Sequence, residues 1–309
     1  MKFLVVARSP TAVEQREVSK EQFDQLLKAR ADLLEVLCIE EKFDMVMENY
    51  CEFEEEILSA SVRYVTFAND ILEMLHRSRL AITRRLANLL TTCRMYLEQS
   101  DHHLTRAFGA SSQLLNDHKA EKSSQYDKHL QYRMMEALRN YAQHRGYPFQ
   151  DITFSSSMVE PKPGSHTVAI IMPKLSIADI EEDGGFKPQV LEEIREAYEP
   201  SFDLRPHIRQ YLDCLHSVQS ALRDRLHEAV ASTKEVLYAA RVQFRDVIPE
   251  PQSIWALELI AQEDAGEETA REFFAFHTIQ RYDSFTVKNR LSRPLKSIYV
   301  SGQIEPPYA

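Results

Sequence analysis

Three side chains with complementary chemistry lie close together in the segment RNYAQHRGYP, residues 139–148. Histidine has an ordinary pKa near neutrality, so a residue such as His144 is suited to taking up and releasing protons. The guanidinium of Arg139 is a permanent cation that matches phosphate oxygens, and the amide of Asn140 can donate and accept hydrogen bonds. These groups suit metal-independent cleavage of a phosphodiester. Because the 2′-hydroxyl of the substrate would be the nucleophile, we expect RNA and not DNA as the substrate.

These residues are expected to lie at the C-terminal end of a helix. Asn140 and His144 are four residues apart and share a face of an ideal helix. Arg139 lies about 100° around the axis from Asn140, so it flanks that face. Leu138 and Tyr141 are expected to point toward the core and to hold the helix in place.

The motif lies in a locally cationic stretch of an acidic protein. Residues 128–145 contain four Lys or Arg and one Glu, whereas the whole chain has a net charge of −10. The flanking polar side chains are therefore predicted to bind the substrate: Lys128, Arg133, Gln143 and Arg145. Gly146 and Pro148 are expected to end the helix directly after the motif.

The segment resembles the HEPN family, whose signature is Arg, four to six residues, and His, with a polar residue after the Arg. Two other stretches fit this loose pattern, namely 209–216 and 271–277. Only the first has Asn after Arg, helices upstream and a helix stop just after His. The resemblance covers the site and, loosely, the helices from about residue 19 to 148, and a helix over 203–244 is a candidate to complete the bundle.

The resemblance implies a metal-independent endoribonuclease that leaves a 2′,3′-cyclic phosphate. Arg139 would stabilise the transition state, Asn140 would orient it, and His144 would act as acid or base. HEPN proteins usually form homodimers in which two motifs share one cleft, and they often serve as toxins or in antiviral defence. Two alternatives stay open: a non-catalytic RNA-binding or scaffold protein that regulates a partner nuclease, and a cluster that only caps a helix end.

Composition and motifs exclude several other classes of protein. The chain has 7 glycines and neither a GxGxxG nor a P-loop pattern, so we expect no cofactor. Its four cysteines form no CxxC pair, so no metal is expected and a reducing, cytoplasmic location is predicted. No apolar run approaches the ~18 residues that cross a membrane. The N-terminal MKFLVVARSP is predicted to be an edge or cap strand.

Hydrophobic periodicity predicts a mainly α fold with a small β hairpin and a mixed C-terminal portion. Ser19 and Gln22 form a capping box at the start of the first helix. Further helices are expected at about 40–67, from about 69 onward, and at about 111–144, 188–198 and 203–244. The hairpin is expected at 151–157 and 167–172. The predicted domains are a HEPN-like bundle, residues 1–148, and a portion over 149–309 that packs on it.

The acidic helix predicted at 40–67 and the basic helix that follows it each have two interpretations. The acidic helix at 40–67 is predicted to present a solvated face in preference to a metal site. The basic helix that follows is expected to pair with it, or else to offer a phosphate-binding surface.

Overall fold

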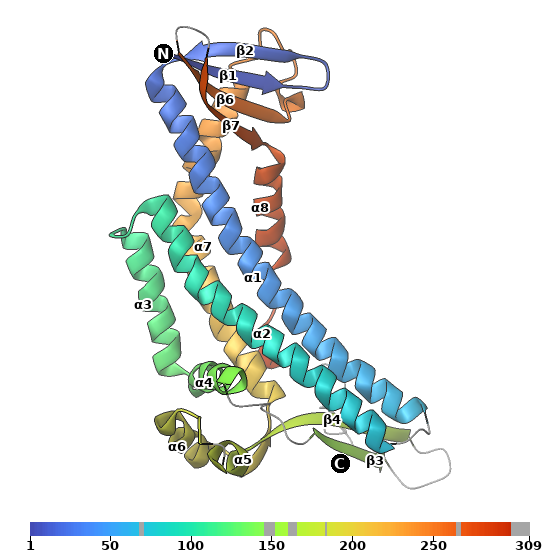
Figure 1. Ribbon diagram of the computed structural model, residues 1–309. Coiled ribbons are helices and arrows are strands. Elements are labelled where there is room, and N and C mark those ends of the chain that lie inside the picture. The colour runs from blue at the N-terminus through green and yellow to red at the C-terminus, as the bar shows by residue number, and fades with distance from the viewer. Residues whose placement is uncertain (68–70, 145–151, 160–165, 183, 264–266, 298–309) are drawn as a thin grey trace. The chain divides into compact units, whose positions relative to one another are not determined.

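The computed structural model describes residues 1–67, 71–144, 152–159, 166–182, 184–263 and 267–297 (Figure 1). Most of these residues are helical and the strands form small antiparallel sheets, which confirms the mainly α fold class. The helices are α1 (Lys20–Thr66), α2 (Ile71–Phe108), α3 (Gln113–Lys128), α4 (Leu130–His144), α5 (Ile177–Glu182), α6 (Pro188–Ala197), α7 (Arg205–Val242) and α8 (His277–Lys288). The strands are β1 (Lys2–Arg8), β2 (Val13–Val18), β3 (Ile152–Val159), β4 (His166–Ser176), β5 (Ser201–Asp203), β6 (Ala256–Gln262) and β7 (Glu268–Ala275), and two short 3-10 helices cover Pro251–Ser253 and Leu295–Ser297. Within the described ranges, no helix is both long enough and apolar enough to cross a membrane.

The chain divides into two compact units, each built from three separate segments. Unit 1 contains residues 1–42, 99–118 and 221–290, and unit 2 contains residues 43–98, 119–220 and 291–309. The helices α1, α2, α3 and α7 contribute residues to both units. Each unit combines segments from both sides of residue 148, the boundary predicted from the sequence, and residue 148 itself lies outside the described residues.

The start of α1 was predicted correctly, but its length was not. The hydroxyl of Ser19 accepts the backbone N–H of Gln22 at 3.1 Å. In return, the side-chain Oε1 of Gln22 accepts the backbone N–H of Ser19 at 3.3 Å, which makes a reciprocal capping box. The helix then continues to Thr66, so the two helices predicted before residue 67 are one. The sequence between them contains no Gly or Pro that would stop a helix.

Unit 1 contains a four-stranded antiparallel sheet in the order β2-β1-β6-β7. The strand β1 pairs on both sides, with β2 and with β6, so the prediction of an edge strand was wrong. One face of the sheet packs on α1 and α7, where the core includes Val5, Phe23, Leu237, Phe244 and Leu259. The sheet was missed because its N-terminal and C-terminal hairpins are separated by more than 200 residues of sequence.

Unit 2 is a group of helices with a three-stranded sheet in the order β3-β4-β5. The predicted hairpin is confirmed, because β3 and β4 pair antiparallel from Ile152–Pro173 to Val159–His166. The predicted helices at 188–198 and 203–244 correspond to α6 and α7. Charge pairing between the acidic and basic helices is also present, since Arg85 on α2 forms an ion pair with Glu52 on α1.

Candidate functional site

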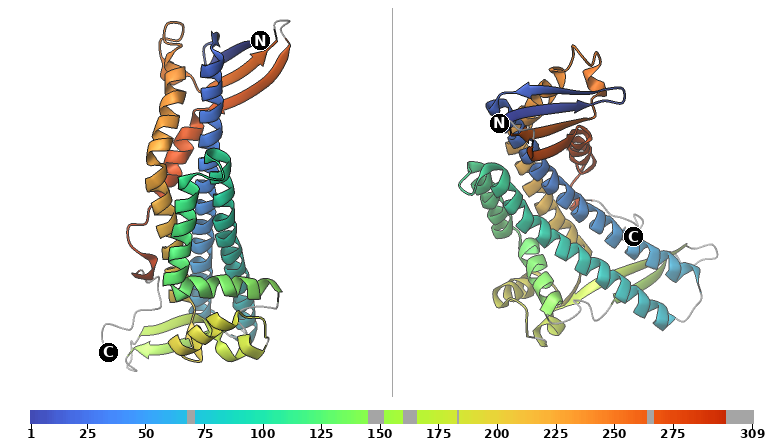
Figure 2. Two further views of the ribbon diagram at one scale, coloured as in Figure 1. Left: turned by 90° about the vertical axis from the view of Figure 1, so that its left-hand side faces the viewer. Right: turned by 45° about the horizontal axis from the view of Figure 1, so that its top comes forward.

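The helix α4 carries the Arg139–His144 motif and lies in unit 2. The sequence predicted one helix over 111–144, but the chain breaks at His129 between α3 and α4. In the left view of Figure 2, α4 crosses the unit 2 helices instead of running alongside them. Arg133 bridges the break, because its Nη1 donates to the carbonyls of Tyr126 and Asp127 at 2.8 Å each. These carbonyls are in the last turn of α3, where the carbonyl oxygens have no N–H donor within the helix.

The two faces of α4 are as the sequence predicted. Leu138 and Tyr141 are buried, and the Tyr141 ring lies 6.2 Å from that of Phe186, centroid to centroid. Asn140 and His144 are exposed, His144 as the last residue of the helix. The buried residues therefore fix the helix, while the two polar residues face solvent.

Arg139 is half-buried and is held against its neighbour. Its Nη1 donates to the Asn140 Oδ1 at 3.0 Å, which leaves the Asn140 amide N–H groups free to face a ligand. The Nε of Arg139 is buried without a hydrogen-bond partner among the described residues. This arrangement gives the guanidinium a defined position beside the exposed face.

The predicted substrate-binding residues differ in their exposure, in their existing hydrogen bonds and in their distance from His144. Gln143 is exposed beside His144 on the last turn of α4. Arg133 donates to Glu193 on α6 through Nε at 3.0 Å as well as to the end of α3, so its guanidinium is already engaged. Lys128 is the last residue of α3, about 20 Å from His144 along α4 at 1.5 Å per residue. Arg145, like the predicted helix stop at residues 146–148, lies outside the described residues.

A part-buried network of hydrogen bonds, which the sequence analysis missed, anchors α4 one turn before the motif. The carboxylate of Glu136 accepts the Tyr211 hydroxyl of α7 at 2.7 Å and the Arg94 Nη1 of α2 at 3.0 Å. Burial, and next the charge of Glu136, raise the pKa of the Tyr211 hydroxyl well above its ordinary value, so the phenol stays protonated as a donor. Glu136 was visible in the sequence only as the single acid in the basic stretch 128–145.

Removal of the hydrogen bond between Tyr211 and Glu136 is expected to destabilise unit 2. We expect Tyr211→Phe to lower the free energy of unfolding by about 1–3 kcal/mol, because one oxygen of the largely buried Glu136 carboxylate loses its donor. Chemical denaturation followed by far-UV circular dichroism measures the change. Tyr238→Phe is the control, since Tyr238 is 41% exposed. Equal stability of both variants would contradict an anchoring role for the hydrogen bond.

The two other segments that match the loose Arg–His pattern, 209–216 and 271–277, have surroundings that differ from those of the Arg139–His144 motif. Arg209 is buried and donates to both oxygens of Glu54, at 2.8 and 2.9 Å. His216 accepts the Leu291 N–H at 3.4 Å through Nε2. Arg271 lies on β7 and His277 on α8, so the third pair does not share a helix. The sequence context had separated these matches from 139–144 on similar grounds.

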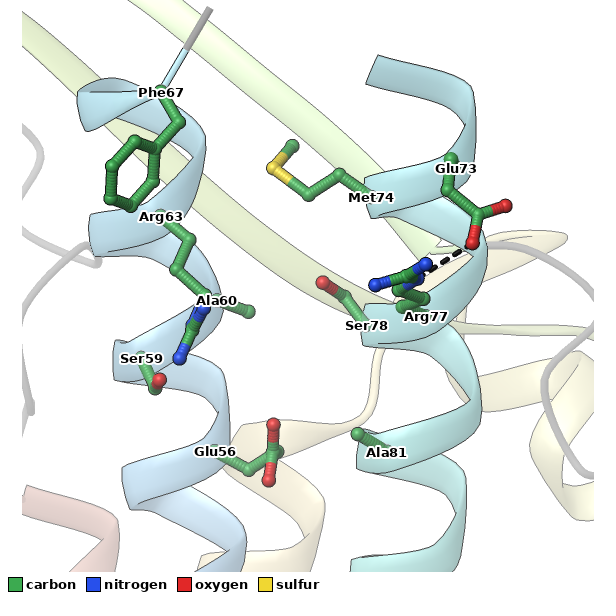
Figure 3. A pocket seen from close by; sticks show the side chains of 10 residues that line it. All are labelled: Glu56, Ser59, Ala60, Arg63, Phe67, Glu73, Met74, Arg77, Ser78 and Ala81. Atoms are coloured by element: carbon green, nitrogen blue, oxygen red, sulfur yellow. Dashed lines mark hydrogen bonds and ion pairs between the residues drawn. The ribbon is translucent and has the colours of Figure 1, made fainter. Parts of the chain in front are cut away.

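A hollow of 540 Å³ lies between the end of α1 and the start of α2 (Figure 3). The side chains of Phe67 and Met74 lie at its outer end, and Arg77 pairs with Glu73 at 2.6 Å on its rim. Among the described residues, none of 128–144 lines it. Among the described residues, no group of three His, Cys, Asp or Glu side chains is placed to hold a metal ion.

Comparisons of the chain with protein-family models, with curated proteins and with solved structures find no match.

Proposed function

We propose that the protein is a metal-independent endoribonuclease of the HEPN type, with Arg139, Asn140 and His144 at its active site. The observation that carries the proposal is the placement of these residues on α4. Asn140 and His144 are exposed on the last two turns, and the guanidinium of Arg139 donates a hydrogen bond to Asn140. A guanidinium and an exposed imidazole on the same short helix supply the cation and the acid or base that cleavage of a phosphodiester needs.

The proposed reaction is attack of a ribose 2′-hydroxyl on the neighbouring phosphorus. The P–O2′ bond forms and the P–O5′ bond breaks, which yields a 2′,3′-cyclic phosphate and a 5′-hydroxyl. His144 takes the proton from the 2′-hydroxyl, and Arg139 and Asn140 donate to the phosphate oxygens as negative charge develops there. The 5′ oxygen needs a proton from a second group, for which we propose His144 of a second copy in a homodimer.

The sugar of the substrate provides a direct test. We expect purified protein to cut end-labelled RNA in EDTA, with a cyclic phosphate at the new 3′ end. DNA of the same sequence should stay intact, and a single 2′-deoxy substitution at the mapped position should prevent cleavage there alone. Cleavage of DNA at a similar rate, or loss of all activity in EDTA, would contradict the mechanism. RNA that is bound but not cut would favour a non-catalytic RNA-binding protein.

A further inference from the structure

Unit 2 contains a second polar site, away from the Arg139–His144 motif. A pocket of 390 Å³ lies between the end of α3, the first half of α7 and residues 291–296. Its lining includes two imidazoles, His129 and His216, and two cationic side chains, Arg293 and Lys296. The volume is within the range of about 300–1,000 Å³ that is usual for small-molecule sites.

Hydrogen bonds to α7 fix the walls of this pocket. The carboxylate of Asp213 accepts the backbone N–H of Leu295 at 2.6 Å and that of Lys296 at 3.0 Å. Nε2 of His216 accepts the N–H of Leu291 at 3.4 Å. The segment 291–296 is thus tied to one helix at both of its ends, and the pocket is formed before any ligand arrives.

The charges of the pocket favour an anion. Among the described residues that line it, Asp213 is the one carboxylate, and both of its oxygens already accept backbone N–H groups. In the part of the chain that the structure describes, Arg293 and Lys296 are exposed and neither side chain makes an ion pair. The described lining therefore carries two cationic side chains against one carboxylate, so a bound anion would meet an excess of positive charge.

The pocket is better suited to binding than to covalent catalysis. The thiol of Cys214 also lines it. Burial raises the pKa of the Cys214 thiol to about 11, so the thiol is protonated at neutral pH. A protonated thiol is a poor nucleophile.

We propose that this pocket binds a small molecule that carries a phosphate group, with Arg293 and Lys296 as its principal contacts. Arg offers a planar fork that matches phosphate oxygens, and Lys adds a compact positive charge. His129 adds an imidazole to the same pocket, while Nε2 of His216 already accepts the Leu291 N–H. The inference does not depend on the proposed ribonuclease, because the pocket and His144 lie near opposite ends of α4.

Titration calorimetry of the full chain tests the proposal, with 5′-AMP and inorganic phosphate as probes and adenosine as the phosphate-free comparison. We expect saturable binding of at least one phosphate-bearing probe, and weakening by about tenfold or more in Arg293→Ala/Lys296→Ala, since two charge-assisted contacts are lost. The control is Arg225→Ala/Arg290→Ala, which removes the same charge at exposed residues that do not line the pocket.

Three outcomes would overturn the assignment. The first is no binding of either phosphate-bearing probe at millimolar concentration. The second is equal weakening by the two double variants, which would indicate attraction by net charge alone. The third is binding of adenosine as tight as that of 5′-AMP. Binding is measured without RNA, so failure here and failure of the ribonuclease proposal are distinguishable.

Discussion

His144→Ala is expected to lower the rate of RNA cleavage by about 10²–10⁴-fold, which is the usual contribution of a general acid or base. The side chain is exposed at the end of α4, so its removal leaves no cavity and the fold should be kept. The measurement is the single-turnover rate on end-labelled RNA in EDTA, with circular dichroism as the check on folding.

The matched control is His102→Ala, because His102 is also an exposed histidine on a helix. Full activity of His102→Ala beside an inactive His144→Ala would assign the loss to the site. Unchanged cleavage by His144→Ala would remove this residue from the mechanism. A wild-type protein that cleaves as a monomer in analytical ultracentrifugation would contradict a site shared between two copies.

Glu54→Ala is expected to lower the free energy of unfolding by about 3–5 kcal/mol, because it leaves a buried charge without its partner. Arg209 is 1% exposed and Glu54 is 7% exposed, and the two form a bidentate ion pair between α7 and α1. Without Glu54, the Arg209 guanidinium either stays buried with no carboxylate beside it, or α1 and α7 move apart so that water can reach it.

Far-UV circular dichroism during urea unfolding is the appropriate readout for this pair, which lies in unit 2. The single tryptophan, Trp255, is in unit 1, so its fluorescence reports on the other unit. Glu55→Ala is the control, because it removes an exposed carboxylate from the next position of the same helix. The double variant Glu54→Ala/Arg209→Met should recover part of the stability, because no unpaired buried charge is left. A loss under 1 kcal/mol in Glu54→Ala would contradict a dominant role for this pair.

Features that depend on neighbouring residues were accessible from the sequence. The capping box of Ser19 and Gln22, the hairpin of β3 and β4, and the two faces of α4 follow from local chemistry and from the periods of helix and strand. These features include the exposure of Asn140, which lies about 160° around the axis from Leu138 and about 100° from Tyr141, whereas His144 is exposed as the last residue of α4. The sequence by itself therefore determined the candidate site and the helix that presents it.

Features that depend on distant residues were decided only by the tertiary structure. The pairing of β1 with β6 joins residues more than 240 positions apart, and no local signal specifies a partner at that distance. The break before α4 has no Gly or Pro, and Arg133, which the sequence analysis predicted as a substrate contact, donates hydrogen bonds across it. The anchor at Glu136 and the pocket near Arg293 likewise combine side chains from three separate segments. Sequence patterns predict which face of an element is polar, but which polar groups meet depends on how the elements pack.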